Sequence, residues 1–193
     1  MTVLTFNLHP VLELTDEQFY QLCQANRDLR FERTAQGEIV IMPPTGGETG
    51  GRNASLTAQL WLWNQQTRLG KSFDSSTGFK LPNGANRSPD AAWVRRDRWD
   101  ALTSEQKRKF IPLCPDFAVE LKSPSDDLED VQYKMQEYLA NGLLLGWLID
   151  PETGQVEIYR PNQELEILDN PTTLSAETVL PGFVLDLISM FED

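Results

Sequence analysis

Hydrophobic and polar residues recur along the chain with two different periods, which predicts a mixture of helices and strands. Apolar residues at helical spacing recur in three segments: 15–29, a second that begins at Glu48 or Asn53 and runs to Leu69, and the residues after Ser125. Thr15 opens the first of these with a capping-box pattern, and Gly70 is expected to end the second. A short charged helix over 103–109 and a C-terminal helix over 187–191 complete the helical set.

Shorter apolar runs between these segments predict strands. They lie at 29–34, 38–42, 71–74, 78–81, 91–95, 117–121, 143–150, 155–160 and 165–168. The three runs between 71 and 95 are expected to form a meander. The pattern therefore predicts a mixed α/β fold, and a length of 193 residues with 40% hydrophobic residues fits one domain over 1–193.

Charged residues interrupt one of the most apolar runs. Glu120 lies inside the run 117–121, and Lys122 follows it. Because side chains alternate along a strand, Glu120 and Lys122 are expected on one face and the large apolar residues of the run on the other. Burying such charges costs several kcal/mol unless they are paired or hold a metal ion.

A second carboxylate, Asp90, follows Pro89 and precedes the apolar run 91–94. Together with Glu120 it can form a divalent-cation site, since Mg²⁺ needs only one or two protein carboxylates. Such an ion and a nearby lysine would support phosphodiester hydrolysis. The alternative is that Glu120 and Lys122 form an ion pair on an edge strand while Asp90 caps a turn, and the spacing alone does not separate the two.

These acids stand in a pattern that resembles a known superfamily. Pro-Asp followed by Glu-x-Lys is similar to the signature of the PD-(D/E)XK nucleases, and the surrounding segments resemble its Uma-two family of restriction endonucleases. The matching segments are 42–48, 88–90, 115–126, 134–138 and 147–151. The resemblance covers roughly residues 15 to 190 and implies a restriction-endonuclease-like mixed central β-sheet flanked by helices.

The resemblance also implies roles for particular residues. Asp90 and Glu120 would be metal ligands, Lys122 the catalytic lysine, and Glu48 a further acid of the metal site near the start of the second helix. Many members lack the lysine two residues after the glutamate, and this chain keeps it. The implied cofactor is Mg²⁺, with Mn²⁺ as a substitute. On its residues alone, Glu48 is better explained as a charge that complements the helix dipole.

Lys134 is a further candidate, on the helix that follows the Glu120 strand. It lies four residues before Tyr138, so the two side chains project in the same direction. Its position resembles the superfamily helix that places a polar residue near the scissile phosphate. An ordinary ion pair with Asp130 on a solvated helix face is the alternative.

The charge of the chain is unevenly distributed. The net charge of −12 argues against nucleic acid, yet the segment from Arg68 to Lys109 holds ten basic and five acidic residues. That segment contains Asp90 together with Trp93 and Trp99, an arrangement that suits a phosphate-binding face. The alternative is a solvated surface that balances acids elsewhere. Strong, salt-resistant DNA binding is not expected.

Composition narrows the chemistry further. His9 is the only histidine, which excludes zinc–histidine clusters and Ser-His-Asp triads, and the two cysteines have no zinc-like spacing. We see no run of eighteen apolar residues and no secretory leader, so a cytoplasmic protein with no membrane span is expected.

The sequence thus predicts a metal-dependent endonuclease that hydrolyses nucleic acid, with DNA as the expected substrate. A homodimer is expected, since a small domain with one site needs a twin to cut both strands. The alternative is a catalytically silent nuclease-fold module that binds or regulates a protein or nucleic-acid partner.

Overall fold

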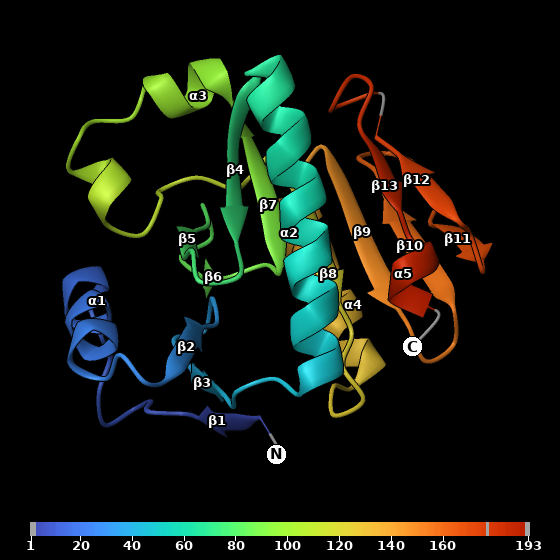
Figure 1. The fold of residues 1–193 in the computed structure, drawn as a ribbon. Coiled ribbons are helices and arrows are strands. Elements are labelled where there is room, and N and C mark those ends of the chain that lie inside the picture. The colour runs from blue at the N-terminus through green and yellow to red at the C-terminus, as the bar shows by residue number, and fades with distance from the viewer. Residues whose placement is uncertain (1–2, 177, 192–193) are drawn as a thin grey trace.

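A mixed β-sheet forms the centre of the protein in the computed structural model, which describes residues 3–176 and 178–191 (Figure 1). Its strands, in spatial order, are β11 (Glu166–Asp169), β10 (Gln155–Tyr159), β9 (Leu145–Asp150), β8 (Phe117–Leu121), β7 (Ala91–Arg95) and β4 (Gly70–Asp74). Strands β8 and β9 are parallel, and the other neighbours are antiparallel. The sheet confirms the predicted mixed α/β class.

Two long helices cover the opposite faces of this sheet (Figure 1). Helix α2 (Gly47–Thr67) packs Leu56, Leu60 and Trp63 on one face, and helix α4 (Leu128–Ala140) packs Met135 and Tyr138 on the other. The apolar stripes of both helices are therefore buried against the sheet, as their spacing predicts.

Strand β8 is sandwiched between the two helices and follows the predicted alternation. Phe117 and Val119 belong to the core on the α2 side, whereas Ala118 belongs to the core on the α4 side. All five residues of the strand are buried. Glu120 therefore faces α4.

A second sheet lies beside the first near the N-terminus. Its order is β1 (Leu4–Phe6), β3 (Ile39–Met42), β2 (Arg30–Arg33), β6 (Asn86–Arg87) and β5 (Phe79–Lys80), with α1 (Asp16–Ala25) packed next to it. The predicted meander is wrong, because β4 pairs directly with β7 while β5 pairs with β6. The buried ring of Phe79 and a bridge from Phe79 to Ile111 hold β5 in the second sheet.

The remaining elements are short. They are α3 (Arg96–Asp100), the 3₁₀ helix η1 (Gln106–Arg108), the hairpin β12 (Thr173–Ser175) and β13 (Val184–Asp186), and α5 (Ile188–Phe191). The hairpin, which the sequence pattern did not predict, buries Leu174 and Leu185 in the core on the α2 side. Among the described residues, no helix is long and apolar enough to span a membrane.

Helix ends follow the predicted chemistry in part. Thr15 and Gln18 form the complete capping box of α1, as predicted. Helix α4 is capped by Asp127, whose side chain accepts from the Glu129 N–H, and not by Ser125. Helix α2 ends at Thr67 and is capped by Arg68, which adopts the left-handed conformation at φ 55°, so the expected stop at Gly70 is wrong.

Candidate active site

Asp90 and Glu120 lie opposite each other at one end of the central sheet. The antiparallel register of β7 and β8 pairs Ala91 with Val119, and one further residue along each strand places Asp90 across from Glu120. Residues directly opposite in an antiparallel pair have Cβ atoms about 4.5–5.5 Å apart. The pairing of the two strands thus brings together two carboxylates that are thirty residues apart in the chain.

The Asp90 carboxylate is held by two donors. Its Oδ2 accepts from the backbone N–H of Leu121 at 2.9 Å, and its Oδ1 accepts from the Asn53 side-chain amide of α2 at 3.1 Å. Burial raises the pKa of Asp90 above its usual value, although these hydrogen bonds oppose the rise. The two donors fix the carboxylate at the end of the sheet and leave each of its oxygens with a further lone pair.

Glu120 is buried and is held by two side chains of α4. Tyr138 donates its hydroxyl to Oε1 at 2.9 Å, and Lys134 Nζ lies 3.0 Å from Oε1 and 3.1 Å from Oε2. Burial raises the pKa of Glu120 to about 7, with Lys134 opposing the rise and the Asp90 and Glu32 carboxylates adding to it. Near neutral pH this carboxyl group is therefore poised between its two protonation states.

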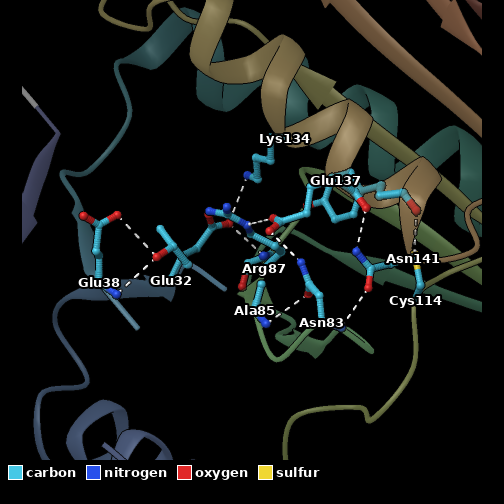
Figure 2. Close-up of polar contacts among 12 residues, drawn as sticks. Glu32, Glu38, Asn83, Ala85, Arg87, Cys114, Lys134, Glu137 and Asn141 are labelled. Atoms are coloured by element: carbon cyan, nitrogen blue, oxygen red, sulfur yellow. Dashed lines mark hydrogen bonds and ion pairs between the residues drawn. The ribbon is translucent and has the colours of Figure 1, made fainter. Parts of the chain in front are cut away.

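Lys134 is fixed by a buried chain of charges that runs away from the acid pair (Figure 2). Its ammonium group lies 2.9 Å from Glu32 of β2, and Glu32 in turn accepts from Arg87 of β6 at 3.1 Å. Arg87 also donates to Glu137 of α4 at 2.5 Å. Burial alone would lower the pKa of Lys134, but Glu120 and Glu32 raise it above its ordinary value. Lys134 therefore remains charged at neutral pH.

This buried array carries more negative than positive charge. Four carboxylates, those of Asp90, Glu120, Glu32 and Glu137, lie around the two buried cations Lys134 and Arg87, and Arg30 also acts on Asp90. Buried carboxylates need compensating charge, and a divalent cation beside Asp90 and Glu120 would supply it. Burial is the main cause of the raised pKa of both Asp90 and Glu120, and neighbouring carboxylates add to the rise only at Glu120.

Lys122 is directed to a different set of partners. Its ammonium group lies 2.8 Å from Glu152 and 3.6 Å from Asp150, at the end of the neighbouring strand β9. Those two carboxylates raise its pKa, although burial opposes the rise. The lysine that the sequence pattern places beside Glu120 is thus paired elsewhere, and Lys134 occupies the position next to Glu120.

Glu48 stands apart from the two acids. It lies in the first turn of α2 with its side chain 75% exposed, and its partner is Arg52 at 3.8 Å. Among the described residues, no three His, Cys, Asp or Glu side chains are grouped so that they can hold one ion. The structure therefore brings Asp90 and Glu120 together without Glu48, and its first-turn position suits the helix-dipole explanation.

Two residues that shape this site were not singled out from the sequence. Asn53 is a polar residue in an amphipathic helix, and Glu32 is a charged residue in a four-residue strand. Glu32 is nevertheless only 3% exposed. Its strand contains two arginines and only one apolar residue, so an acid there is a weak local signal that is equally typical of a solvated strand face.

A groove runs along α2 from the residue that contacts Asp90. It has a volume of about 390 Å³ and is lined by Asn53, Ala54, Thr57, Ala58, Trp61, Asp74 and Ser75. Asn53, which holds Asp90, forms part of its wall, and Trp61 is 53% exposed. Arg30 donates to both oxygens of Ser75 and so places a cation beside the groove.

Much of the basic segment is neutralised within the protein. Five of its ten basic residues form ion pairs with the chain's own acids, namely Lys80, Arg87, Arg95, Arg98 and Lys109. Arg87 is also buried. These pairs favour the charge-balancing explanation for that half of the segment over a continuous phosphate-binding face.

Comparisons with known proteins agree with the fold and with the motif pattern. No curated protein matches the chain. A solved structure described as a "putative nuclease belonging to DUF820" from Anabaena variabilis is similar to it, with a TM-score of 0.71 and 22% sequence identity. The match covers 83% of this chain and 89% of that one. At this identity the similarity shows a shared fold.

The sequence comparison reaches the family level. Residues 16–188 match the family Uma2, described as "Putative restriction endonuclease". The match spans the central sheet, both flanking helices and the candidate site. It agrees with the resemblance to the Uma-two family in the sequence motifs, and nuclease activity is the activity that it supports. The chain therefore belongs to the Uma2 family of restriction-endonuclease-like proteins.

Proposed function

We propose that the protein is a metal-dependent endonuclease that hydrolyses phosphodiester bonds in nucleic acid, with DNA as the substrate. The observation that carries this proposal is the pair of opposed carboxylates, Asp90 and Glu120, with the Lys134 ammonium group 3.0 Å from one of them. Two acids and a cation at the end of a sheet provide both metal ligands and a fixed positive charge for phosphoryl chemistry.

The residues fit Mg²⁺ or Mn²⁺ in their chemistry. Both are hard cations that prefer carboxylate oxygens, and Mg²⁺ commonly takes one or two protein carboxylates and keeps several waters. Asp90 and Glu120 supply those oxygens, and their burial beside each other favours a cation that compensates their charge. The chain's single histidine, His9, lies near the N-terminus and is not needed.

The protein's own side chains divide the remaining tasks. Tyr138 and Lys134 fix the Glu120 carboxylate, while Leu121 N–H and Asn53 fix Asp90. When bound, Mg²⁺ supplies Lewis-acid stabilisation of charge on the phosphoryl oxygens and lowers the pKa of the attacking water. Lys134 adds a positive charge that stays in place during the reaction, since Glu32 holds it from the other side.

Lys134 is the lysine of this proposed site. The resemblance to the superfamily points to Lys122, but the Lys122 ammonium group is paired with Glu152 and Asp150. Lys134 comes from α4, fourteen residues further along the chain than Glu120, and contacts both Glu120 oxygens. We assign the electrostatic role to Lys134 and a structural role to Lys122.

The groove on α2 offers a path for the substrate strand. Its wall begins at Asn53, beside Asp90, and continues along the helix to Trp61. An exposed tryptophan can stack on a nucleobase of any sequence, and the nearby Arg30 guanidinium can contact phosphate. A single-stranded or locally opened segment fits such a path better than an intact duplex.

A silent binding module is the competing function. Its supporting observation is that Lys122, the lysine of the motif, is held in ion pairs on the far side of β8 from β7. Metal binding does not separate the two functions, whereas turnover does. In a silent module, replacing Lys122 or Lys134 would not change the cleavage of nucleic acid, because no phosphodiester bond is cut.

The experiment is a cleavage assay with a panel of substrates. Supercoiled plasmid, linear duplex, single-stranded DNA and RNA are incubated with the protein and with Mg²⁺, Mn²⁺ or EDTA. The proposal predicts divalent-dependent nicking of circular DNA, which has no ends and so reports internal cleavage. Light scattering on the same preparation tests whether a second copy pairs with the first, as cutting both strands would require.

A further inference from the structure

Asn53 has one hydrogen-bonding atom that the Asp90 contact does not explain. Its amide nitrogen donates to Asp90 Oδ1 at 3.1 Å. Its carbonyl oxygen, Oδ1, is buried and has no hydrogen-bond partner among the described residues. Leaving such an acceptor buried and unpaired is unfavourable, because it loses its hydrogen bonds to water, so it calls for an explanation.

The place of this oxygen distinguishes it from the other unpaired polar atoms. Asn86 Oδ1 and Trp147 Nε1 are also buried without a partner, but neither side chain contacts the acid pair in the described hydrogen bonds. Asn53 alone among the three touches a candidate metal ligand. Its unpaired oxygen belongs to the same small amide group that contacts Asp90.

Another asparagine of the same helix shows what a purely structural role looks like. Asn64 is buried in α2, and its Oδ1 accepts from the Trp93 indole N–H at 2.9 Å. That amide oxygen is fully used in packing the helix on the sheet. The Asn53 oxygen has no such role, although the nitrogen of the same amide contacts Asp90.

The carboxylate oxygens of Asp90 and Glu120 differ in the number of lone pairs that remain free to bind a cation. Glu120 Oε1 already accepts from both Tyr138 and Lys134, while Glu120 Oε2 accepts from Lys134 alone. Each oxygen of Asp90 accepts a single hydrogen bond. The two carboxylates therefore have few free lone pairs, and a neutral amide oxygen is a ligand that hard cations readily accept.

We infer that Asn53 is a third protein ligand of the divalent-cation site, through its Oδ1, in addition to orienting Asp90 through its amide nitrogen. The inference rests on the proposed metal-dependent function and extends its ligand set to α2. The carboxamide adds an oxygen without adding a further negative charge to a buried array that already holds an excess of carboxylates.

The test compares two substitutions that separate the oxygen from the nitrogen. Asn53→Ala removes both, whereas Asn53→Asp keeps an oxygen at the same place but loses the N–H donor to Asp90. Gln65→Ala, at an exposed position of the same helix, controls for changes in helix stability. Binding of Ca²⁺ alone is measured by calorimetry, and folding of each variant without metal is checked by circular dichroism.

The expected result is that Asn53→Ala weakens Ca²⁺ binding about tenfold or more, while Asn53→Asp binds at least as tightly as the wild type and Gln65→Ala is unchanged. Weaker Ca²⁺ binding by Asn53→Asp than by the wild type overturns the inference, because a carboxylate oxygen at a ligand position should bind Ca²⁺ at least as well as an amide oxygen. Unchanged binding in Asn53→Ala overturns it as well. A wild type that binds neither Ca²⁺ nor Mn²⁺ contradicts both the inference and the metal-dependent function. Weaker Ca²⁺ binding by Asn53→Ala, in a protein whose wild type cleaves no nucleic acid, contradicts the proposed function alone.

Discussion

Lys134 Nζ lies within hydrogen-bonding distance of both Glu120 oxygens, at 3.0 Å and 3.1 Å, across the interface between helix α4 and strand β8. This contact makes a helix residue the cationic partner of the acid pair. The lysine next to Glu120 in the sequence motif, Lys122, is paired with Glu152 instead. The positions of the two lysines lead to a direct comparison of their roles.

Lys134→Met and Lys122→Met should have unequal effects on cleavage. Loss of the charge beside Glu120 should lower kcat by about a hundredfold or more, the scale of a lost preorganised electrostatic group. Lys122→Met removes a partly exposed ion pair with Glu152, so kcat should change by no more than about fivefold. The measurement is the single-turnover cleavage rate at saturating metal.

Control measurements show whether Lys134→Met or Lys122→Met loses activity only because the variant unfolds. Lys134→Met leaves Glu32 with one fewer cation in a buried setting, so its thermal unfolding is measured alongside. Lys134→Arg keeps the charge and should recover part of the rate. Equal losses in the two methionine variants, or a larger loss in Lys122→Met, would return the catalytic role to the motif lysine.

Metal binding should stabilise the wild type and not the variants of the acid pair. A ligand that binds only the folded state raises the melting temperature, so Ca²⁺ should raise the Tm of the wild type. Asp90→Asn and Glu120→Gln keep the side-chain volumes but remove a charged ligand, and each should abolish most of the shift. The measurement is a thermal melt with and without Ca²⁺.

Glu48→Gln serves as the matched control for these two substitutions. Its side chain is exposed and paired with Arg52, so the Ca²⁺-induced shift in Tm should equal that of the wild type. A loss of the shift in Glu48→Gln as large as that in Glu120→Gln would place Glu48 in the metal site after all.

The strand pattern predicted the position of Glu120 because alternation is a local property. Phe117 and Val119 on one face leave Glu120 on the other whatever the rest of the chain does, provided that the strand is buried. Alternation also predicts the face of the strand on which the Lys122 side chain begins, but it does not predict the acid with which its ammonium group pairs. Its partners lie on β9 and in the turn that follows, thirty residues away in the chain.

The remaining contacts of the site depend on tertiary pairing that no local pattern contains. Glu32 reaches Lys134 only because β2 pairs with β6 and the second sheet is packed beside α4. Asn53 reaches Asp90 because α2 crosses the end of β7. The predicted meander was wrong for a related reason, since the burial of Phe79 decides which sheet β5 joins.

The pH dependence of metal binding should follow Glu120. Its pKa is raised to about 7, and the metal binds the carboxylate, so Ca²⁺ affinity should fall as the pH drops below about 7. Calorimetry at several pH values should show proton release near pH 6 and little near pH 8. Affinity that is constant between about pH 5.5 and 8 would contradict the assignment of Glu120 as a ligand.

The same shift has a consequence for stability without metal. Because the folded-state pKa of Glu120 lies above its ordinary value, the folded protein binds the proton more tightly than the unfolded chain does. The stability that this group contributes is present at low pH and is lost as the pH rises from about 4.5 through 7. In EDTA, the wild type should therefore lose stability relative to Glu120→Gln over that interval, as measured by urea unfolding.

Trp61→Ala should weaken nucleic-acid binding with little effect on chemistry. Stacking of one base on an aromatic side chain contributes about 1–3 kcal/mol, so the Kd for a short single-stranded oligonucleotide in Ca²⁺ should rise about fivefold or more. Leu62→Ala, a similarly exposed residue of α2 that does not line the groove, is the matched control. Equal affinities in the two variants would show that the strand takes another path.

The most direct test of metal-dependent cleavage at Glu120 is an assay on circular DNA. The wild type and Glu120→Gln are purified in parallel and assayed with Mg²⁺ or Mn²⁺. Glu120→Gln keeps the shape of the side chain but removes the charge at the centre of the site, and a nuclease contaminant would be common to both preparations. If Glu120 is a metal ligand of a nuclease site, the wild type should nick the plasmid, EDTA should stop the cleavage, and Glu120→Gln should be at least about a hundredfold slower. Equal cleavage by both proteins, or no cleavage of any substrate by a wild type that binds metal, would contradict this assignment.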